Sequence, residues 1–411
     1  MERFVDLGVS FFDPDFTLDP FPYLEELYGR EDILGFQADG MNFIFRFDQA
    51  SQVIRGRHCR RQPLANPEIE ARERIYDERY PTRARHFSLA YPGMAGSGKP
   101  DFVVKRLLME FLDETAGAAD FSGAAPIFAR LGQAGRLDDY IESVQTLPLR
   151  VMLETCGLPF SEEDLADLVA AGMDFIKALD NFADEAPLAG AEAGLVRLWA
   201  YLGERLPEAA PDSKIRSFFD RGLALGVSEE SLFVNFGGFV IQALSNTAGL
   251  SSAYVLRNLI RYPEVRIELE KNRDLVQSPD VIIELLRRDN HVKALSRQVH
   301  EDFALDGFPM RRGESIFLFF PGVNLDPAEY PNPLSIDLNR QHTGGKHLVF
   351  GGSAHLCIGR NLGIAFVRNM VEGFVRYLPE QAHILEDEVD VDGTWIAERI
   401  IRKMPIALGS A

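Results

Sequence analysis

The chain has 411 residues, 46% of them apolar, which is enough to build an extended hydrophobic core. Acidic side chains outnumber basic ones by 62 to 43, and the formal net charge of -19 argues against general affinity for nucleic acid or an anionic membrane. The three cysteines, Cys59, Cys156 and Cys357, lie far apart without Cys-x-x-Cys spacing. This pattern favours neither a disulfide framework nor a zinc finger, and it indicates a reducing compartment.

The amino-terminal segment 1–16 lacks the basic flank and apolar run of a signal peptide. The most apolar run, 232–244, contains two glycines, an asparagine and a glutamine, and it is shorter than the roughly 20 residues of a membrane helix. We therefore expect a cytoplasmic protein without membrane insertion.

The first half of the chain begins with strand-like segments and continues as helices. Segments 33–37 and 41–45 flank an Ala-Asp-Gly turn and predict a hairpin. Helical periodicity dominates from about 100 to 262, with long segments at 138–156 and 161–178 and a glycine- and alanine-rich helix junction at 117–125.

Segment 232–260 is apolar nearly all round, which predicts a helix surrounded by protein. Its expected start is just after Ser228, with Glu229 and Glu230 in the first turn, and its expected end is near Pro263.

The second half of the chain alternates between strand-like and irregular sequence. Segment 303–319 alternates around Gly307 and Gly313, which predicts a small hairpin. Segment 321–345 is rich in Pro, Asn and Asp, which predicts a long functional loop. We expect a single domain over 1–411, mainly α with small β-sheets. The β-rich portions are predicted near 30–46, 295–320 and 380–408, and the helical body at about 100–290 and 358–378.

Residues 350–359 read FGGSAHLCIG and place Cys357 in a glycine-rich turn directly before a helical segment. Unpaired N–H groups and the helix dipole at such a position lower the pKa of a thiol and favour the thiolate, which is the form that binds a metal. The alternative is a small buried cysteine in a tight turn, as most free cysteines are.

The spacing Phe-x-x-x-x-His-x-Cys-x-Gly resembles the haem-binding loop of the cytochrome P450 family. This resemblance implies that Cys357 is the axial thiolate ligand of the iron of haem b. It also implies that Phe350, Gly351 and Gly359 shape the loop against the haem and that His355 binds a propionate. The family fold buries the haem between a long central helix and this cysteine-containing loop.

The loop departs from the family pattern at a few positions. Ser353 stands where the family usually has glycine, and Gly363, Ile364 and Phe366 replace a common Ala-Arg-x-Glu. These departures concern the shape of the loop and not the identity of the ligand.

A second motif is Glu284-Leu-Leu-Arg287, whose spacing places both charged side chains on one face of a helix. By itself it is typical of a surface ion pair worth under about 1 kcal/mol. In the family, however, a Glu-x-x-Arg helix is locked by an arginine from the loop before the haem cysteine. Arg340, which follows DPAEYPNPLSIDLN, matches that arginine.

Two further arginines match family residues that bind haem propionates. Arg297 lies thirteen residues after Glu284, and Arg106 resembles the arginine of a helical His-x-x-x-Arg element in which Phe102 replaces the histidine. Bidentate guanidinium groups are well suited to a buried carboxylate. Each of the two could instead be a plain surface arginine.

Counting back from Pro263, Thr247 falls where the family has the threonine beside bound dioxygen. Asn246 stands where the family usually has a carboxylate, and an amide donates hydrogen bonds but does not relay protons as an acid does. Proton delivery would then use ordered water, Ser245, Gln242 or a substrate hydroxyl. The simpler interpretation of Thr247 is a hydroxyl that bonds the preceding helical turn.

The resemblance also implies a substrate pocket lined from four parts of the chain: segment 86–98, Gln242 and Ala243, the stretch 292–296 with Val292, Lys293 and Ala294, and the carboxyl-terminal segment 396–401, which begins at Ile396. His291 and Lys293 could recognise a polar substrate group, but we expect them to face solvent. The pocket is expected to take a small, largely apolar organic substrate.

The expected electron donors are a separate ferredoxin and its ferredoxin reductase, because the chain shows no flavin module and no cysteine cluster. An acidic ferredoxin needs a local basic patch on this acidic protein. We expect that patch around Cys357, from Lys105, Arg106, Lys346, Arg360 and Arg368, although these charges could also be scattered.

Three functions therefore compete. The first is an oxidoreductase of the monooxygenase type, which inserts one atom of dioxygen into the substrate. The second is a peroxide-driven or non-redox haem-thiolate enzyme, suggested by Asn246. The third is a haem sensor without catalysis, which no residue positively favours.

Overall fold

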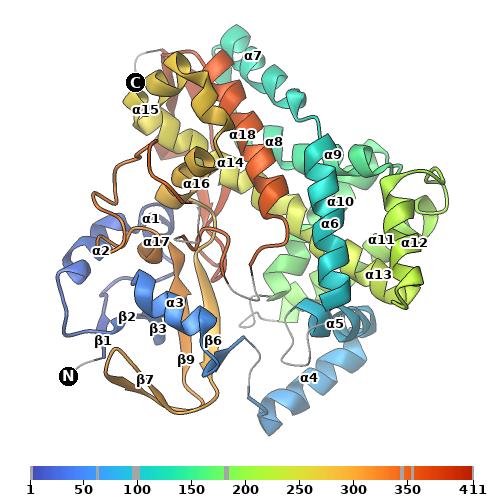
Figure 1. The fold of residues 1–411 in the computed structure, drawn as a ribbon, viewed down its shortest axis with the longest axis horizontal. Helices are drawn as coiled ribbons and strands as arrows, with labels where there is room; N and C mark the ends of the chain where they lie inside the picture. The colour runs from blue at the N-terminus through green and yellow to red at the C-terminus, as the bar shows by residue number, and fades with distance from the viewer. Residues whose placement is uncertain are drawn as a thin grey trace.

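The computed structural model describes residues 3–61, 64–94, 102–179, 185–342, 347–352 and 356–409. Helices make up most of it, and the largest sheet lies to one side of them (Figure 1). The helices of the first half are α1 Pro14–Leu18, α2 Phe21–Tyr28, α3 Phe47–Arg55, α4 Pro67–Arg79, α5 Pro81–Met94, α6 Phe102–Ala118, α7 Ala125–Ala134, α8 Tyr140–Gln145, α9 Leu147–Cys156, α10 Glu162–Leu179 and α11 Glu185–Arg205.

The second half continues with α12 Lys214–Ala224, α13 Glu229–Phe236, the π-helix η2 Gly237–Gln242, α14 Ala243–Arg261, α15 Pro263–Lys271, α16 Pro279–Arg288, α17 Phe320–Val323 and α18 Arg360–Tyr377. Short 3-10 turns lie at η1 Ser122–Ala124, η3 Arg273–Gln277 and η5 Glu386–Glu388. The predicted helix junction at 117–125 is confirmed, since α6 ends and α7 begins there. Segment 138–156 divides into α8 and α9, because Pro148 occupies the first turn of the second helix.

The largest sheet has six strands in the order β1-β2-β3-β9-β6-β4. Its strands are β1 Phe4–Asp6, β2 Gly35–Ala38, β3 Met41–Ile44, β4 Cys59–Arg60, β6 Ala294–Val299 and β9 Ser315–Phe319. The predicted hairpin is β2 and β3, which pair antiparallel from Ala38 opposite Met41. Asp39 and Gly40 between them both have positive φ, 48° and 74°, as a two-residue hairpin turn requires.

Segment 303–319 contains the predicted small hairpin in its first half. β7 Phe303–Leu305 and β8 Phe308–Met310 pair with each other, whereas β9 pairs with β3 and β6 in the large sheet. Two small sheets complete the fold: β10 Ala382–Ile384, β13 Ile406–Leu408 and β5 Arg136–Leu137 form one, and β11 Asp390–Asp392 with β12 Ile400–Lys403 forms the other.

The long central helix begins as predicted, because the Ser228 hydroxyl accepts a hydrogen bond from the Ser231 N–H at its first turn. It ends at Arg261, two residues before Pro263. The sequence did not predict the π-helical turn η2 between α13 and α14. That turn begins at Gly237, where a side chain would come within 3.0 Å of Leu198 on α11.

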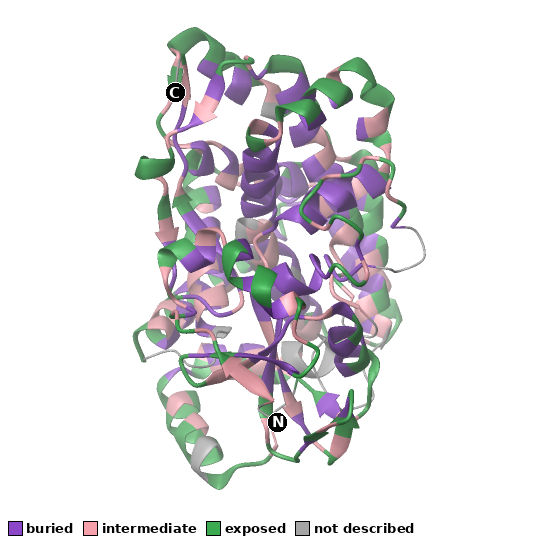
Figure 2. Cartoon of the chain, turned by 90° about the vertical axis from the view of Figure 1, so that its left-hand side faces the viewer, coloured by how far each residue is buried: buried purple, intermediate pink, exposed green. Residues whose placement is uncertain are grey.

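The core surrounds α14, and Figure 2 shows buried residues concentrated along the centre of the molecule. α14 packs against α8, α10, α16 and α18. A second cluster, rich in phenylalanine, joins the large sheet to the amino-terminal segment and includes Phe11, Phe16, Phe36, Phe43 and Phe319. Within the described ranges, no helix is both long enough and apolar enough to cross a bilayer.

Candidate functional site

Cys357 lies in the turn that leads into α18, a helix that packs against α14 and α6 (Figure 1). Its backbone N–H donates to the Phe350 carbonyl at 2.9 Å, which closes the loop on itself. Gly351 has a φ of 71°, so the turn at this position favours glycine. Gly359, the N-cap of α18, donates its backbone N–H to the cysteine sulfur.

Cys357 differs from the other two cysteines in its surroundings. Cys59 and Cys156 are buried, whereas the side chain of Cys357 is exposed. Burial nevertheless raises the pKa of the Cys357 thiol, and the Gly359 N–H opposes that rise. A side chain that is accessible and yet desolvated lies on the wall of an interior space.

The prediction that the helix N-terminus lowers this pKa is therefore wrong for the protein groups by themselves. Desolvation of the charge outweighs one N–H donor. A thiolate at Cys357 needs a cation beside it, and a coordinated metal ion is the group that deprotonates a thiol outright.

Arg297 is a buried guanidinium without a carboxylate partner among the described residues. It lies on β6, is 5% exposed, and donates to the carbonyl of its neighbour Ser296 at 2.8 Å. Burial, and then the nearby Arg61, lower its pKa to about 10. Because an uncompensated buried charge is costly, this site fits an anionic group such as a haem propionate.

Of the other two predicted propionate ligands, only Arg106 lies within the described residues. Arg106 is 65% exposed and lies 3.8 Å from Glu110 on α6, so it is placed as a surface arginine. Its neighbour Lys105 is half-buried, and burial lowers the pKa of that lysine. His355 and the side chain of Phe102 lie outside the described residues.

Glu284 and Arg287 on α16 are not a surface pair, as their exposed fractions are 0% and 1%. Arg287 Nε donates to Glu284 Oε2 and Nη2 donates to Oε1, each at 2.8 Å. The remaining donors of Arg287 bind the carbonyls of Asn324 and Pro333, both at 2.9 Å, and of Ser335 at 3.0 Å. All five guanidinium N–H groups of Arg287 thereby donate to the Glu284 carboxylate or to carbonyls of the loop 324–335.

The loop before the cysteine supplies the other partners of Glu284. Arg340 Nε lies 3.3 Å from Oε1, as the family resemblance predicts, and the Asp337 N–H donates to the same oxygen at 2.9 Å. His342 Nε2 lies 2.8 Å from Oε2. Burial raises the pKa of Glu284, but the bonds from Arg287 and His342 outweigh it and hold that pKa well below its ordinary value.

Sequence reasoning did not find His342. A histidine two residues after Arg340 in an irregular loop has no periodicity that marks it. Its role depends on the path of the loop back over α16, where the His342 N–H also donates to Asp280 at 3.0 Å.

On α14, the Thr247 hydroxyl donates to the Ala243 carbonyl at 2.8 Å, which is the bond that the simpler interpretation predicts. The oxygen keeps lone pairs that accept hydrogen bonds. Thr247 and Ala243 are half-buried, whereas Ala248, Gly249 and Leu250 on the same helix are buried. The side chains of Gln242, Ser245 and Asn246 lie outside the described residues.

The predicted pocket residues on the carboxyl side have different surroundings. Lys293 does not face solvent: it is 1% exposed, and its ammonium donates to Thr17 at 2.9 Å and to the carbonyls of Phe11 and Trp395. The expectation failed because the amino-terminal segment folds over this position. Ala294 and Ile396 are buried in the phenylalanine-rich cluster, whereas Val292 is half-buried.

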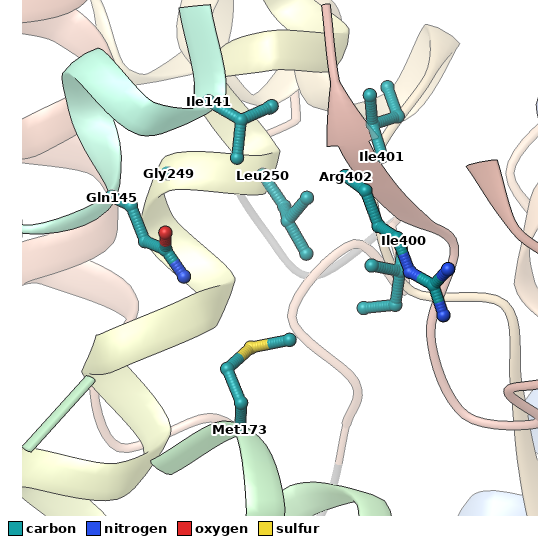
Figure 3. A pocket seen from close by; sticks show the side chains of 8 residues that line it. All are labelled: Ile141, Gln145, Met173, Gly249, Leu250, Ile400, Ile401 and Arg402. Carbon is teal, nitrogen blue, oxygen red and sulfur yellow. The ribbon is translucent and has the colours of Figure 1, made fainter. Parts of the chain in front are cut away.

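A cavity of about 130 Å³ lies beside α14, between α8, α10 and β12 (Figure 3). It is lined by Ile141, Gln145, Met173, Gly249, Leu250, Ile400, Ile401 and Arg402. Leu250 follows Thr247 by three residues, a spacing that places the two side chains near one face of α14, whereas Gly249 lies on another side of the helix.

Comparison with known proteins identifies the class. A family model described as cytochrome P450 matches residues 243–378. Cytochrome P450 144 of Mycobacterium tuberculosis is 27% identical over 234 residues, which cover 55% of this chain and 52% of that protein. The chain thus spans about half the length of this relative. Pulcherriminic acid synthase of Bacillus subtilis is 22% identical over 364 residues, 83% of this chain and 84% of that protein.

Solved structures agree on the fold. Cytochrome P450epoK with bound epothilone D has a TM-score of 0.79 at 20% identity and covers 98% of this chain and 99% of its own. P450BioI in complex with an acyl carrier protein has a TM-score of 0.75 at 17% identity, with coverages of 96% and 100%.

Residues 243–378 match the cytochrome P450 family, and the chain has the cytochrome P450 fold. Haem b is the cofactor of this family. The described residues fit it, because they combine an accessible but desolvated cysteine with a buried guanidinium that lacks an anion.

Proposed function

We propose that the protein is a haem-thiolate monooxygenase that inserts one atom of dioxygen into a small, largely apolar organic substrate. The observation that carries the proposal is Cys357, held at the start of α18 with its sulfur on an interior wall. When bound there, haem supplies dioxygen activation, which a thiolate ligand promotes by donating electron density.

The residues of the chain divide the remaining work. Cys357 holds the iron, and Arg297 neutralises a propionate. The cluster of Glu284, Arg287 and Arg340 fixes the loop that ends at the cysteine. On the other side, Thr247 positions a water or substrate hydroxyl beside the reacting oxygen, with Asn246 next to it in the chain.

Electrons come from a separate ferredoxin and its reductase. In support, α6, which carries Lys105 and Arg106, packs against α18, which carries Arg360 and Arg368. Arg106 is exposed, and Lys105, Arg360 and Arg368 are half-buried, while Lys346 lies outside the described residues. Reversing the charge of Arg106 and Arg360 together should slow reduction by a ferredoxin.

A second candidate is a peroxide-driven haem-thiolate enzyme. Asn246 favours it, since an amide does not deliver protons and dioxygen cleavage requires them. Peroxide already carries both of the electrons and the protons that the dioxygen route must supply.

Asn246→Asp separates the two candidates. The measurement is the fraction of NADH electrons recovered as product, with a surrogate ferredoxin and reductase, against product formed with added hydrogen peroxide. A monooxygenase with an impaired relay should gain coupling by about tenfold or more, since a positioned acid contributes about 10²–10⁴-fold. Turnover with peroxide but not with electron donors, in both proteins, would support the second candidate instead.

A further inference from the structure

His291 and Ser251 form a hydrogen-bonded pair that joins α14 to the segment after α16. The Ser251 hydroxyl lies 2.9 Å from His291 Nδ1 and 2.8 Å from the Thr247 carbonyl. Ser251 follows Thr247 by four residues, so both lie on the same face of the helix. The pair therefore lies one turn along α14 from the proposed oxygen side.

The backbone that carries His291 is fixed on both sides. Asp289 forms a buried ion pair with Arg399, and the Arg399 N–H donates to the His291 carbonyl at 2.6 Å. Asn290 accepts a bond from the Val292 N–H at 2.8 Å. A side chain supported in this way is held ready for a ligand.

The imidazole of His291 is neutral at physiological pH. Burial, and then the nearby charge of Arg399, lower its pKa to about 4. The single hydrogen of the Ser251 hydroxyl is used on the Thr247 carbonyl, as in most serines inside helices. Nδ1–H of His291 then donates to Ser251, which leaves a lone pair on Nε2.

That lone pair faces an accessible space. His291 is half-buried, as are Val292 beside it and Thr247 on the facing helix. Nε2 has no hydrogen-bond partner in the described part of the chain. It is also not among the fully enclosed side-chain nitrogens that lack a partner, so it keeps some accessible surface. An acceptor that is desolvated in this way gains from a ligand donor.

We propose that His291 Nε2 accepts a hydrogen bond from a hydroxyl or N–H group of a neutral substrate and so orients that substrate before Thr247. A carboxylate is disfavoured because it would meet a neutral imidazole lone pair. This proposal rests on the proposed function, since it places the substrate in the haem-side space. It narrows the substrate class to molecules with a neutral donor group.

The competing interpretation is structural, with His291 only tying the α16 segment to α14. Ligand selectivity separates the two, because a structural tie does not discriminate between ligands that differ by one donor. Decan-1-ol and its methyl ether form such a matched probe pair. Their dissociation constants are measured by absorbance titration of the haem-loaded protein, a readout that needs no turnover.

The wild type should bind decan-1-ol about three- to tenfold more tightly than the ether, as expected for one net hydrogen bond. His291→Leu should bring this ratio to about one, while His291→Gln, whose amide oxygen also accepts, should keep it above one. Ser251→Ala should reduce the ratio partly, because the ring loses its fixed tautomer.

A wild type without preference for the alcohol, or one that binds neither probe, overturns the proposal. So does a preference that survives in His291→Leu, as it would if the hydroxyl bound the iron directly. Absence of a thiolate-type haem spectrum, by contrast, overturns the proposed function itself, and that spectrum is recorded before each titration.

Discussion

Two polar regions, one on α16 and one just beyond its end, are built in opposite ways. Glu284, near the middle of α16, has partners for both carboxylate oxygens, and its partner Arg287 uses all five donors. His291, just beyond the end of α16, has one ring nitrogen bonded and the other open. Seven residues apart, one polar group stabilises a loop and the other is left for a ligand.

The difference teaches that burial and hydrogen bonding together distinguish the scaffold from the site. Glu284 and Arg287 are fully buried, whereas His291 and Thr247 are half-buried. In the scaffold, both carboxylate oxygens of Glu284 and every donor of Arg287 have a hydrogen-bond partner. At the site, a side chain is held in place but keeps one acceptor atom without a partner among the described residues.

The largest effect is expected from Glu284→Gln. It leaves the guanidinium of Arg287 buried without its counter-charge, and breaking a buried pair in this way costs about 3–5 kcal/mol. The free energy of unfolding in denaturant measures this cost. Glu208→Gln is the matched control, because Glu208 is an exposed partner of Arg205 and its loss should cost under about 1 kcal/mol. Similar losses in the two variants would show that the cluster is not a scaffold.

Arg297→Leu should produce effects of opposite sign with and without haem. Removing an unpaired buried charge should stabilise the apoprotein, whereas loss of a propionate partner should weaken haem binding by about 30-fold. Apoprotein unfolding and the rate of haem transfer to an acceptor protein measure the two. Arg106→Leu, on the exposed face of α6, should change neither appreciably. Equal haem loss from both variants would contradict this assignment of Arg297.

The smallest expected effect is a difference in the pH range over which Glu284 and His291 change the free energy of unfolding. The folded pKa of Glu284 is lowered, so its contribution to stability is present above the unfolded value of 4.5 and is lost as pH falls below it. The pKa of His291 is lowered from 6.5 to about 4, so the unfolded state binds protons first and stability falls between those values. His86 and His347 titrate in the same window.

Unfolding measured between pH 7 and 4 should therefore lose less stability in His291→Gln than in the wild type, with the remaining loss due to His86 and His347. Glu284→Gln should change the slope only below about pH 4.5. An unchanged slope in His291→Gln would contradict the burial of a neutral imidazole.

The features that the sequence predicted well depend on local rules. The Asp39-Gly40 turn, the Ser228 cap and the Glu284-Leu-Leu-Arg287 spacing each follow from residues close together in the chain. Arg340 was found because the family resemblance supplied a long-range contact that spacing alone does not give.

The features that were missed depend on how distant segments pack. Gly237, where the π-turn begins, lies against Leu198 of α11, and His342 reaches Glu284 through the path of a loop. Lys293 was expected at the surface because nothing near it in sequence shows that Phe11 folds over it. Ser251 could have been noticed from its spacing to Thr247, but its partner His291 is forty residues away.

The carbon monoxide spectrum of the reduced protein tests the central claim most directly. The account predicts a thiolate-type absorbance band for the wild type and its loss in Cys357→Ser, with Cys156→Ser unchanged as the control, because Cys156 is buried away from the site. A histidine-type spectrum from the wild type, or a thiolate-type band that survives in Cys357→Ser, would contradict the assignment of Cys357 as the haem ligand.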